Sequence, residues 1–454
     1  MAQPHLTIIG GGITGLASAY LASQEGWRVT VLEGSARVGG LLETFPTAGD
    51  PLECFYHHFF THDAELRWLV RELGVTDELE FPAASMGIAR DGKIYPFNGP
   101  ADLLRFSPLG WIDKLRFAGS SLYLSMFADW RRWENTSALS WFERHAGKTA
   151  TDAIWRPMLE IKFGPYAPQV PVSWIVGRLR QRVRSRERGS ERLGYLRGSL
   201  RLLLERLVAK LKERGVEIVV NARAESFKFE SGRLTAVDTP LGRWAGDRFL
   251  ATLPTIHLAP LVAAANPEFA ARLNQIEYFG ALCVVLELSE PLSQTYWLNV
   301  ADPGFPFGGV IEHTNLVPPS RYGGSHLVYL SRYFEAGNAI ATQPEAEVLA
   351  SFLAALRRLY PHFAEKNVRR SHVFRARTAA TVCDLGISQK IPPWRSPIEN
   401  LCLASMCHVY PDERSCNNSI RIAADACMAM GLQCASVPRG STFAGQALRP
   451  NRSS

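Results

Sequence analysis

Hydrophobic and polar positions change their spacing several times along the chain, and each change predicts a different element. Residues 5–15 begin as a short hydrophobic run and end in a glycine-rich turn, and hydrophobic residues then recur at helical spacing over 16–26. A second hydrophobic run over 27–33 ends in an acidic residue. This order of strand, glycine turn, helix and strand predicts a nucleotide-binding βαβ unit.

The remainder of the chain alternates between helical and strand-like blocks. Hydrophobic residues recur at helical spacing in some blocks and at every second position in others. The alternation on both sides of Asp91-Gly92 is typical of a hairpin. The predicted elements are a hairpin over 86–97, a mostly helical region over 101–190, a long amphipathic helix over 200–215, short strands over 216–254, a sheet over 280–335, a helix over 343–359, and a strand, polar loop and helix over 400–431.

Composition agrees with a globular protein of two or three intertwined domains. The chain has 454 residues, of which 46% are hydrophobic and 20% charged. No hydrophobic run reaches the length of a membrane span, and the first strand begins too early to leave room for a signal peptide. We therefore expect a cytoplasmic protein. Its eight cysteines lack CxxC and metal-ligand spacing, so we expect reduced, buried thiols and no metal.

The net charge of +7 is concentrated in one stretch. Residues 177–206 carry ten arginines against three glutamates. This pattern favours an anionic substrate or the anionic inner face of a membrane, with a solvated basic surface as the alternative. No nucleic-acid-binding module accompanies the arginines, so nucleic acid is not expected. Residues 109–112 and 117–130 are hydrophobic enough to contact lipid, although we favour core packing for them.

Glycines and one acid carry the first chemical signal. Gly10 lies where a strand must turn sharply into a helix, a conformation that glycine adopts at low cost. Gly12 and Gly15 follow at the spacing that opens a helix toward a pyrophosphate, which the free N–H groups of the first turn attract. Glu33 ends the second strand, where it can accept hydrogen bonds from a ribose. Beyond it, Gly39-Gly40 lets the backbone approach a bulky cofactor closely.

The stretch after Glu33 resembles the flavin-containing amine oxidase superfamily, which includes protoporphyrinogen oxidases, phytoene desaturases and UDP-galactopyranose mutases. An acid followed by R-x-G-G is matched by Glu33, Arg37, Gly39 and Gly40, whereas Leu41 stands where many members carry a second arginine. The resemblance extends to about residue 431 and implies FAD rather than NAD. The cofactor contacts that it implies are Gly10, Gly12, Ile13, Thr14, Gly15, Glu33, Gly34, Arg37, Gly39, Gly40, Leu41, Ala224, Met406, Arg414, Asn418 and Ser419.

The resemblance also implies a domain plan. An α/β, Rossmann-like FAD-binding domain is expected to be interrupted by a substrate domain made of a sheet and helices. No second GxGxxG in a strand-to-helix setting indicates a separate NAD(P)H domain. The expected parts are the FAD-binding domain (1–80, 194–260 and 395–431), a sheet-rich substrate domain (81–100 and 261–394), a helical insertion covering the cavity (101–193) and a disordered tail (432–454).

Two adjacent histidines are the first candidates for catalysis. His57 and His58 follow the second glycine motif, and either ring can act as a base or a hydrogen-bond donor near neutral pH. Neighbouring side chains on an extended chain point in opposite directions, so we expect only one of them to face the flavin. Packing against the surrounding aromatic residues is the alternative.

A polar run in the second sheet gives the remaining candidates. Glu312, His313 and Asn315 lie among hydrophobic strand residues, which indicates a cavity wall, although a strand end would also tolerate them. We count Glu312 and His313 as candidate catalytic residues and Asn315 as a candidate for substrate binding. Weaker candidates for substrate binding are Tyr95 and Phe97 on one strand face, Arg332 and Tyr333 on opposite faces, Lys162 and Tyr166.

Three functions fit the sequence. The first is an FAD-dependent oxidase or dehydrogenase that removes a hydride from a C–N or C–C bond of a bulky, anionic or isoprenoid small molecule, with oxygen or a quinone as the electron acceptor. The second is a redox-neutral mutase resembling UDP-galactopyranose mutase, in which arginines bind a diphosphate. The third is a flavoprotein subunit without catalytic turnover. Peripheral contact with a membrane is compatible with all three.

Overall fold

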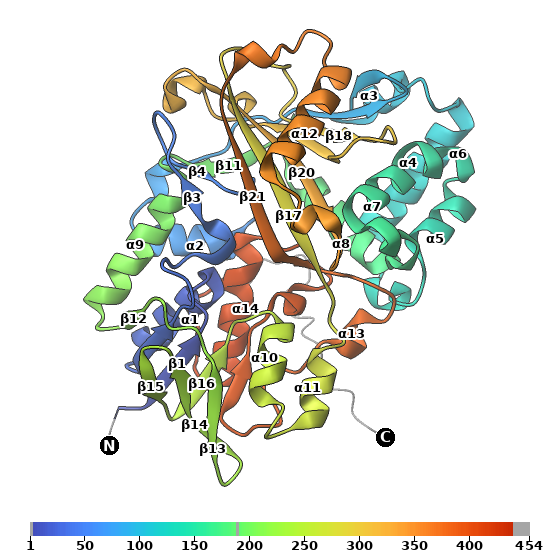
Figure 1. Cartoon of the computed structure of the whole chain (residues 1–454). Coiled ribbons are helices and arrows are strands. Elements are labelled where there is room, and N and C mark those ends of the chain that lie inside the picture. The colour runs from blue at the N-terminus through green and yellow to red at the C-terminus, as the bar shows by residue number, and fades with distance from the viewer. Residues whose placement is uncertain (1–2, 188–189, 439–454) are drawn as a thin grey trace.

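A five-stranded parallel sheet forms the first layer of the computed structural model, which describes residues 3–187 and 190–438 (Figure 1). Its strand order is β12-β2-β1-β16-β22, and all four neighbouring pairs run parallel. The βαβ unit predicted at the start of the chain is present. The strands are β1 (His5–Ile9), β2 (Arg28–Leu32), β12 (Glu217–Val219), β16 (Arg248–Ala251) and β22 (Leu401–Leu403).

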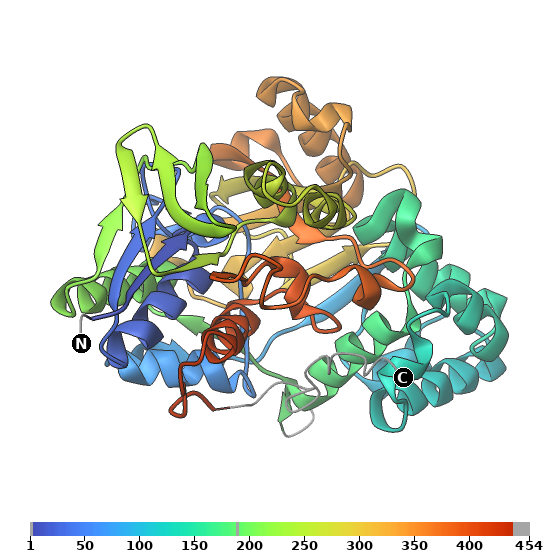
Figure 2. The ribbon, with the colours of Figure 1, turned by 90° about the horizontal axis from the view of Figure 1, so that it is seen from below.

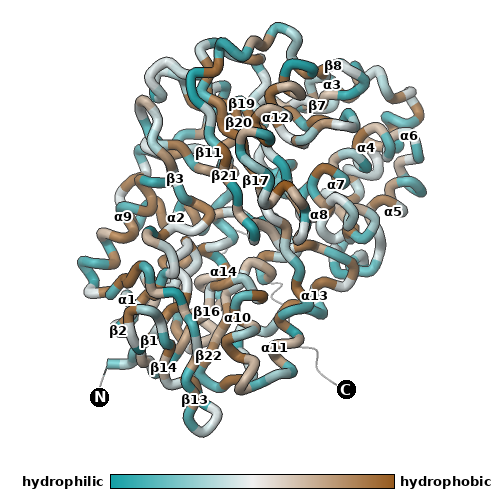
Figure 3. Tube along the Cα trace, viewed as in Figure 1, coloured by the Kyte–Doolittle hydropathy of each residue, from teal (hydrophilic) through white to brown (hydrophobic). Residues whose placement is uncertain are grey.

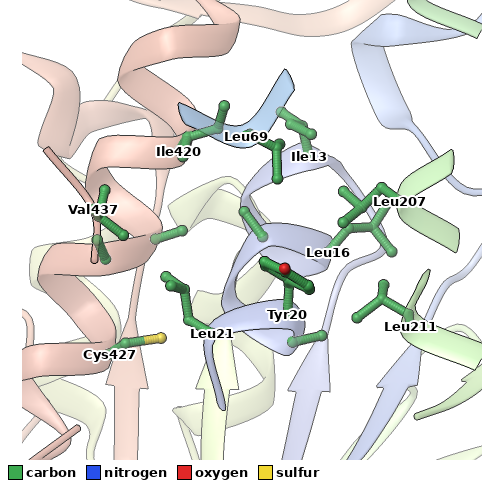
Figure 4. Close-up of a cluster of buried hydrophobic side chains, with 14 of the residues drawn as sticks. Ile13, Leu16, Tyr20, Leu21, Leu69, Leu207, Leu211, Ile420, Cys427 and Val437 are labelled. Carbon is green, nitrogen blue, oxygen red and sulfur yellow. The ribbon is translucent and has the colours of Figure 1, made fainter. Parts of the chain in front are cut away.

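Helices cover one face of this sheet. Figure 4 shows Leu16 and Tyr20 of α1 packed between residues of α9, such as Leu207, and residues of α14, such as Ile420. The predicted amphipathic helix is α9, and its trace in Figure 3 alternates between hydrophobic and hydrophilic residues. The helices on this face are α1 (Ile13–Gln24), α2 (Ala64–Glu72), α9 (Ser199–Glu213) and α14 (Cys416–Ala429).

A smaller antiparallel sheet and two helices cover the opposite face. Phe249 of β16 packs with Phe227 and Val237 of the small sheet and with Leu258 of α10 in one buried cluster. The three strands of the small sheet match the short strands predicted over 216–254. The elements on this face are β13 (Ser226–Glu230), β14 (Arg233–Thr239), β15 (Gly242–Ala245), α10 (Thr255–Val262) and α11 (Pro267–Leu273).

A seven-stranded mixed sheet forms the second large layer, with β17 and β21 as its longest strands (Figure 1). The predicted hairpin is β7–β8, and Asp91 adopts a positive φ of 53° at its turn. The helix α12 (Glu345–Leu359) packs on one face of this sheet. In sheet order the strands are β21 (Val368–Thr381), β17 (Tyr278–Leu288), β20 (His326–Phe334), β19 (Gly309–Glu312), β18 (Trp297–Val300), β7 (Met86–Arg90) and β8 (Lys93–Pro96).

Helices over 100–184 form a separate layer around buried aromatic rings such as Phe142 and Trp155, which stack 4.1 Å apart. Figures 1 and 2 place this layer on the opposite side of the molecule from the N-terminal strands. The helices are α3 (Pro100–Arg105), α4 (Trp111–Met126), α5 (Ala138–His145), α6 (Lys148–Ala150), α7 (Arg156–Phe163) and α8 (Val172–Arg184).

Short strands and one short helix connect these layers. Among them β5 and β6 both pair with β11, which brings residues near the second glycine motif beside the chain that enters α9. The connecting elements are β3 (Thr44–Phe45), β4 (Leu52–Glu53), β5 (Phe59–Phe60), β6 (Leu79–Glu80), β9 (Arg186–Glu187), β10 (Ser190–Glu191), β11 (Leu193–Leu196) and α13 (Ile387–Lys390).

The parallel sheet takes its strands from three separate parts of the chain, all inside the stretches assigned to the FAD-binding domain. The origin of these strands supports the proposed domain plan. One expectation about the tail differs from the structure. Leu432, Cys434 and Val437 are buried against α1 and α14, because hydrophobic side chains in 432–438 complete that core (Figure 4). The rest of the predicted tail, 439–454, lies outside the described residues.

Core packing was the favoured prediction for 109–112 and 117–130, and it is wrong for more than half of these residues, which are exposed. Leu109, Phe117 and Leu124 are buried, whereas Ile112 and Met126 are exposed. The reason is that α4 packs by one face only, with its other face directed to the surface.

Candidate active site

A groove at the carboxyl edge of the parallel sheet is shaped for the adenosine half of a dinucleotide. Gly10 follows β1 with a φ of +113°, a backbone conformation that favours glycine. Gly15 lies so close to this turn that a Cβ atom would come within 2.0 Å of the Gly10 carbonyl oxygen. Glycine at these two positions therefore allows the tight turn and the close contact between helix and strand.

The carboxylate of Glu33 organises the loops around the groove. It accepts hydrogen bonds from the backbone N–H of Gly11 at 2.8 Å and from the backbone N–H and hydroxyl of Ser35 at 2.8 and 2.7 Å. The backbone N–H of Ala222 donates to the Glu33 carbonyl oxygen at 2.8 Å. These bonds bring the segment after β12, which contains Ala224, beside the end of β2.

Sequence reasoning missed part of this groove. Arg223 and His257 line it together with Gly10, Glu33 and Ala224. Arg223 was within reach of prediction, since it adjoins Ala224 and its charge suits a nucleotide. His257 lies on α10, and nothing in its local sequence indicates a ligand.

The N-terminus of α1 is open toward a pyrophosphate. No side chain caps this helix, and a Cβ atom built on Gly12 would meet nothing within 4 Å. The first-turn backbone N–H groups of Ile13 and Thr14 therefore face space that an anion can enter. The chain thus fits a dinucleotide at this place.

The second glycine motif packs directly on the first. The backbone N–H of Gly39 donates to the Gly11 carbonyl oxygen at 2.9 Å, and a Cβ atom on Gly40 would lie 3.5 Å from the Gly12 Cα. Arg37, predicted to contact the cofactor, is exposed and pairs with Glu43 at 2.5 Å. Among the other predicted contacts, Gly34 lines the groove and Leu41 packs against the hydrophobic cluster beneath the large sheet.

A separate cavity lies where α7 and α8, the large sheet and the loop before α14 meet. Its walls are largely aromatic and aliphatic, and all four of these elements contribute charged side chains to its lining. The lining residues that matter for chemistry are Tyr56, His57, His58, Lys162, Trp174, Arg178, Trp297, Arg332, Tyr333, Glu413 and Arg414. The prediction named His57, His58, Lys162, Arg332, Tyr333 and Arg414 among them, and the structure brings these six together.

Four cations and one carboxylate give this cavity a positive charge. Lys162 and Glu413 form an ion pair, and Arg178 lies 3.9 Å from the same carboxylate. Burial alone would raise the pKa of Glu413, but Lys162 and Arg178 outweigh it and lower the pKa to about 2. The side chain of Arg332 makes no hydrogen bond or ion pair with any residue in 3–187 or 190–438, whereas its backbone pairs with Leu282 in the sheet. The uncompensated cations favour an anionic ligand.

Tyr333 is a phenol in an unusual electrostatic setting. Arg414 donates a hydrogen bond from Nη2 to its hydroxyl oxygen at 2.9 Å, and Lys162 Nζ lies 5.7 Å from its ring centroid. Burial would raise the pKa of Tyr333, yet Arg414 and Lys162 hold the pKa below its ordinary value. Arg332 and Tyr333 both line the cavity although strand alternation predicts opposite faces, because β20 ends at Phe334 and the cavity wraps around that end.

Both histidines line the cavity, and which of them faces the flavin stays a prediction. Residues 54–58 are not part of a strand, and strand alternation does not apply to them. His57 Nδ1 lies 2.6 Å from the Phe55 carbonyl oxygen, and His58 Nδ1 lies 3.2 Å from the Tyr296 hydroxyl. Burial, followed by repulsion from Arg414, lowers the pKa of His57 to about 4.

The polar cluster at 312–315 holds a loop instead of lining the cavity. Glu312 accepts hydrogen bonds from the backbone N–H groups of Leu292 and Ser293 at 2.9 and 2.8 Å. Asn315 donates to the Ser293 carbonyl oxygen at 3.1 Å, and His313 Nε2 lies 2.7 Å from the Tyr322 hydroxyl. These polar groups are present because the buried loop backbone needs hydrogen-bond partners. The interpretation as a cavity wall therefore differs from the structure.

Other candidates lie outside the cavity. Tyr95 and Phe97 both pack against Phe106, at 5.0 and 5.7 Å between ring centroids, and belong to the core of the helical layer. The hydroxyl of Tyr166 donates to Glu277. The side chain of Asn418 donates to the Glu413 carbonyl oxygen at 2.7 Å, which orders the loop before α14. Met406 packs against the helical core, and the backbone N–H of Ser419 bonds to the Ser415 carbonyl oxygen.

Sequence reasoning also missed cavity residues. Arg178 and Trp174 are one helical turn apart on α8, and Trp297 begins β18. The concentration of arginines in 177–206 was a signal for Arg178, although it does not distinguish Arg178 from its neighbours. Glu413 stands beside the predicted Arg414. Its role depends on Lys162, 251 positions away, and no local pattern shows that contact.

Comparison with known proteins gives three kinds of similarity. A sequence model described as flavin containing amine oxidoreductase matches residues 13–410. The chain is 26% identical to a mitochondrial protoporphyrinogen oxidase of Nicotiana tabacum over 165 residues, which are 34% of this chain and 32% of that protein. It is 24% identical to a coproporphyrinogen III oxidase of Mycobacterium tuberculosis over 303 residues, which are 62% of this chain and 65% of that protein. The matches thus span less than two thirds of these relatives' lengths.

The fold itself is shared with solved structures. A reduced UDP-galactopyranose mutase superposes with a TM-score of 0.73 at 14% sequence identity, covering 96% of this chain and 98% of that one. At this identity the similarity shows the fold alone. The groove and the cavity described above lie inside that shared architecture.

Proposed function

The chain belongs to the flavin-containing amine oxidoreductase family, and from this membership we propose that it oxidises a small molecule carrying carboxylate or phosphate groups. The cofactor is FAD, in keeping with the flavin-containing family and with a groove suited to a dinucleotide. One observation carries the substrate class. The cavity presents Lys162, Arg178, Arg332 and Arg414 against the single carboxylate of Glu413.

The residues proposed to hold FAD have separate tasks. Glu33 is placed for the ribose, the N-terminus of α1 for the pyrophosphate, and Arg223 with Ala224 for the adenine end. Bound FAD supplies a hydride acceptor, so the protein contributes orientation, electrostatics and exclusion of water. In this proposal Tyr56, Trp174 and Trp297 form the hydrophobic walls that exclude water from the cavity.

Substrate binding is assigned to the cations of the cavity whose charge is not neutralised by a close carboxylate. The Arg332 side chain has no hydrogen-bond or ion-pair partner among the described residues, and Arg178 Nη1 lies 3.9 Å from the Glu413 carboxylate, beyond hydrogen-bond distance. A guanidinium binds a carboxylate or phosphate through two parallel hydrogen bonds, which fixes orientation as well as position. Glu413 is placed to keep Lys162 in position, because the two form an ion pair inside the cavity.

His57 is the group best placed to accept a proton. Its Nδ1 faces the Phe55 carbonyl oxygen at 2.6 Å, and a carbonyl can only accept, so Nδ1 carries the ring proton. Nε2 then keeps its lone pair. Because the pKa of His57 is lowered to about 4, the ring is neutral at pH 7, so Nε2 is free to accept a hydrogen bond or a proton, and the ring is a weak base.

Anaerobic flavin reduction tests the proposal. The purified chain is mixed with candidate donors, including coproporphyrinogen III, the corresponding neutral esters and putrescine, and the flavin absorption band is followed. We expect an anionic donor to bleach the band, the neutral ester to react much more slowly, and oxygen or a quinone to restore the band. Absence of bound flavin, or faster reduction by a cationic amine than by any anionic donor, would contradict the proposal.

A second candidate is a redox-neutral mutase acting on a diphosphate-linked sugar. Arg178 and Arg332 favour it, because both line the same cavity and two guanidinium groups suit a diphosphate. A mutase would turn over only after chemical reduction of the flavin and would consume no further reductant. An oxidase would consume one equivalent of acceptor per substrate. A flavin that no donor reduces would instead indicate the third function, a subunit without catalytic turnover.

A further inference from the structure

The outward face of α4 is hydrophobic, whereas the outward face of an ordinary surface helix is polar. Seven of the twelve large hydrophobic side chains that are exposed in the described chain lie between residues 111 and 127. Their exposed fractions reach 73% for both Ile112 and Leu115. We call the following six residues the α4 face: Trp111, Ile112, Leu115, Leu122, Met126 and Phe127.

Helical geometry gathers the α4 face into one stripe. At about 100° per residue, the five members within α4 fall inside an arc of about 100°. The opposite arc holds the buried Phe117 and Leu124, and also the buried Lys114 and Ser120. A helix that buries a lysine and exposes tryptophan, isoleucine and leucine has the wrong polarity for water on its outer side.

The contacts of α4 fix this orientation. Lys114 Nζ donates to the Leu104 carbonyl oxygen at 2.7 Å. At the other end, Arg180 of α8 donates to the carbonyl oxygens of Ser125 and Ala128 at 3.2 and 2.6 Å. Turning the hydrophobic stripe inward would break these bonds and expose Phe117. The stripe is therefore a permanent feature of the surface.

Exposed arginines lie on α4 itself and on the segments that precede and follow it. The last turn of α3 contributes Arg105, α4 itself Arg116, and the segment after α4 Arg131 and Arg132, and all four are exposed. Of the nearby acids, Asp129 lies 3.8 Å from Arg131. A stripe of tryptophan, isoleucine and leucine bordered by arginines matches the chemistry of an anionic lipid surface. Symmetric contact between two copies would instead bring like charges together.

We propose that the α4 face inserts into the interfacial region of an anionic lipid bilayer, with α4 lying in the plane of the membrane. No helix within 3–187 or 190–438 has the length and hydrophobicity needed to cross a bilayer. The helix behind α4 is α8, which also carries Trp174, Ile175 and Arg178 of the cavity. A docked α4 therefore places the cavity on the membrane side of the molecule, independently of which reaction occurs there.

Vesicle flotation of the full chain tests this proposal. Two vesicle preparations are used, one of phosphatidylcholine and one of phosphatidylcholine with a third of phosphatidylglycerol. The wild type is expected to float with the anionic vesicles and several-fold less with the neutral ones. With anionic vesicles, the bound fraction of the double variant I112D/L115D is expected to be at least ten-fold lower than that of the wild type. The matched control L241D changes another exposed leucine, 57% exposed, and should bind as the wild type does.

A second variant reports insertion directly. Leu122→Cys labelled with an environment-sensitive fluorophore should show a blue shift and a rise in intensity with anionic vesicles, while a label on Leu241→Cys should not. Equal flotation of I112D/L115D and the wild type would overturn the proposal, as would an unchanged label at residue 122. So would a wild-type dimer in light scattering that I112D/L115D converts to a monomer, since the α4 face would then be an interface between copies.

Discussion

Arg414 donates a hydrogen bond to Tyr333 at 2.9 Å inside the cavity, and this contact holds the pKa of the phenol below its ordinary value against the effect of burial. The two residues lie 81 positions apart, on the loop before α14 and near the end of β20. Their pairing gives the cavity a hydroxyl whose pKa is below that of an ordinary phenol. It also makes the charge of Arg414 measurable through the titration of Tyr333.

Replacing Arg414 with methionine should raise the pKa of Tyr333 by about one to three pH units, because one of the two cations that oppose burial is removed. The measurement is the ultraviolet titration of tyrosinate, with Tyr333→Phe subtracted to isolate this residue. Arg414→Lys keeps the charge and should shift the titration less. If Tyr333→Phe removes no titrating group below pH 10, the assigned electrostatics are incorrect.

Glu413→Gln should lower the free energy of unfolding at pH 7 by about 3 kcal/mol, since Lys162 and Arg178 lose their buried partner. The pKa of this carboxyl is lowered to about 2 from 4.5, so its stabilising contribution is present above pH 4.5 and is lost as the pH falls toward 2. Chemical denaturation across that range measures both effects.

A matched control for this variant is Glu399→Gln. Glu399 also pairs with an arginine, Arg233, but both side chains are exposed. Its loss should cost less than about 1 kcal/mol, as is usual for surface ion pairs. Equal effects of the two variants would show that Glu413 is not held by the cavity cations.

Asp63→Asn should act with the opposite dependence on pH. Burial raises the pKa of Asp63 to about 7 from 3.8, so its contribution to stability is present below pH 3.8 and is lost as the pH rises through 7. The variant should therefore match the wild type near pH 4 and exceed its free energy of unfolding by up to about 4 kcal/mol at pH 8. Asparagine keeps an oxygen for the Phe60 backbone N–H. A stability difference that is the same at both pH values would contradict this.

The nucleotide groove was largely predictable because its signals are local. Gly10, Gly12, Gly15 and Glu33 lie within one βαβ unit, and backbone geometry ties their spacing to their function. The same holds for the hairpin at Asp91, where the turn residues determine the pairing. The family resemblance added the cofactor, which glycine spacing alone does not distinguish.

The cavity was less predictable because its walls come from distant segments. The expectation that only one histidine would face the flavin relied on strand geometry that residues 54–58 do not adopt. The polarity of Glu312 suggested a ligand site, whereas its partners are backbone N–H groups of residues 292 and 293. A polar side chain in a buried sheet needs a hydrogen-bond partner. The sequence does not say whether that partner is a ligand or the backbone of a loop.

Gly12→Ala and Gly15→Ala should fail in different ways. At Gly12 the added methyl meets no protein atom, so the chain should fold and lose FAD affinity at least ten-fold, because the methyl enters the space proposed for the pyrophosphate. At Gly15 it would lie 2.0 Å from the Gly10 carbonyl oxygen, so the free energy of unfolding should fall as well. Flavin content and thermal denaturation separate the two outcomes.

Gly119→Ala, also in open space, is the control and should retain FAD. Full flavin occupancy in Gly12→Ala would refute the proposed pyrophosphate site.

Arg332→Gln should weaken substrate binding without weakening the fold. Because the Arg332 side chain has no hydrogen-bond or ion-pair partner among the described residues, its removal leaves no buried carboxylate uncompensated, and the thermal transition should stay where it is. A charged hydrogen bond to the substrate contributes about 1.5–3 kcal/mol, so the substrate concentration for half-maximal flavin reduction should rise by about 10- to 100-fold. The limiting rate of reduction should change little, because the guanidinium is assigned to binding and not to proton transfer.

Arg377→Gln on β21 removes the same charge from an exposed position outside the cavity and should leave both values unchanged. An equal loss in the two variants would assign the effect to net charge, and no loss in Arg332→Gln would remove this residue from the binding site.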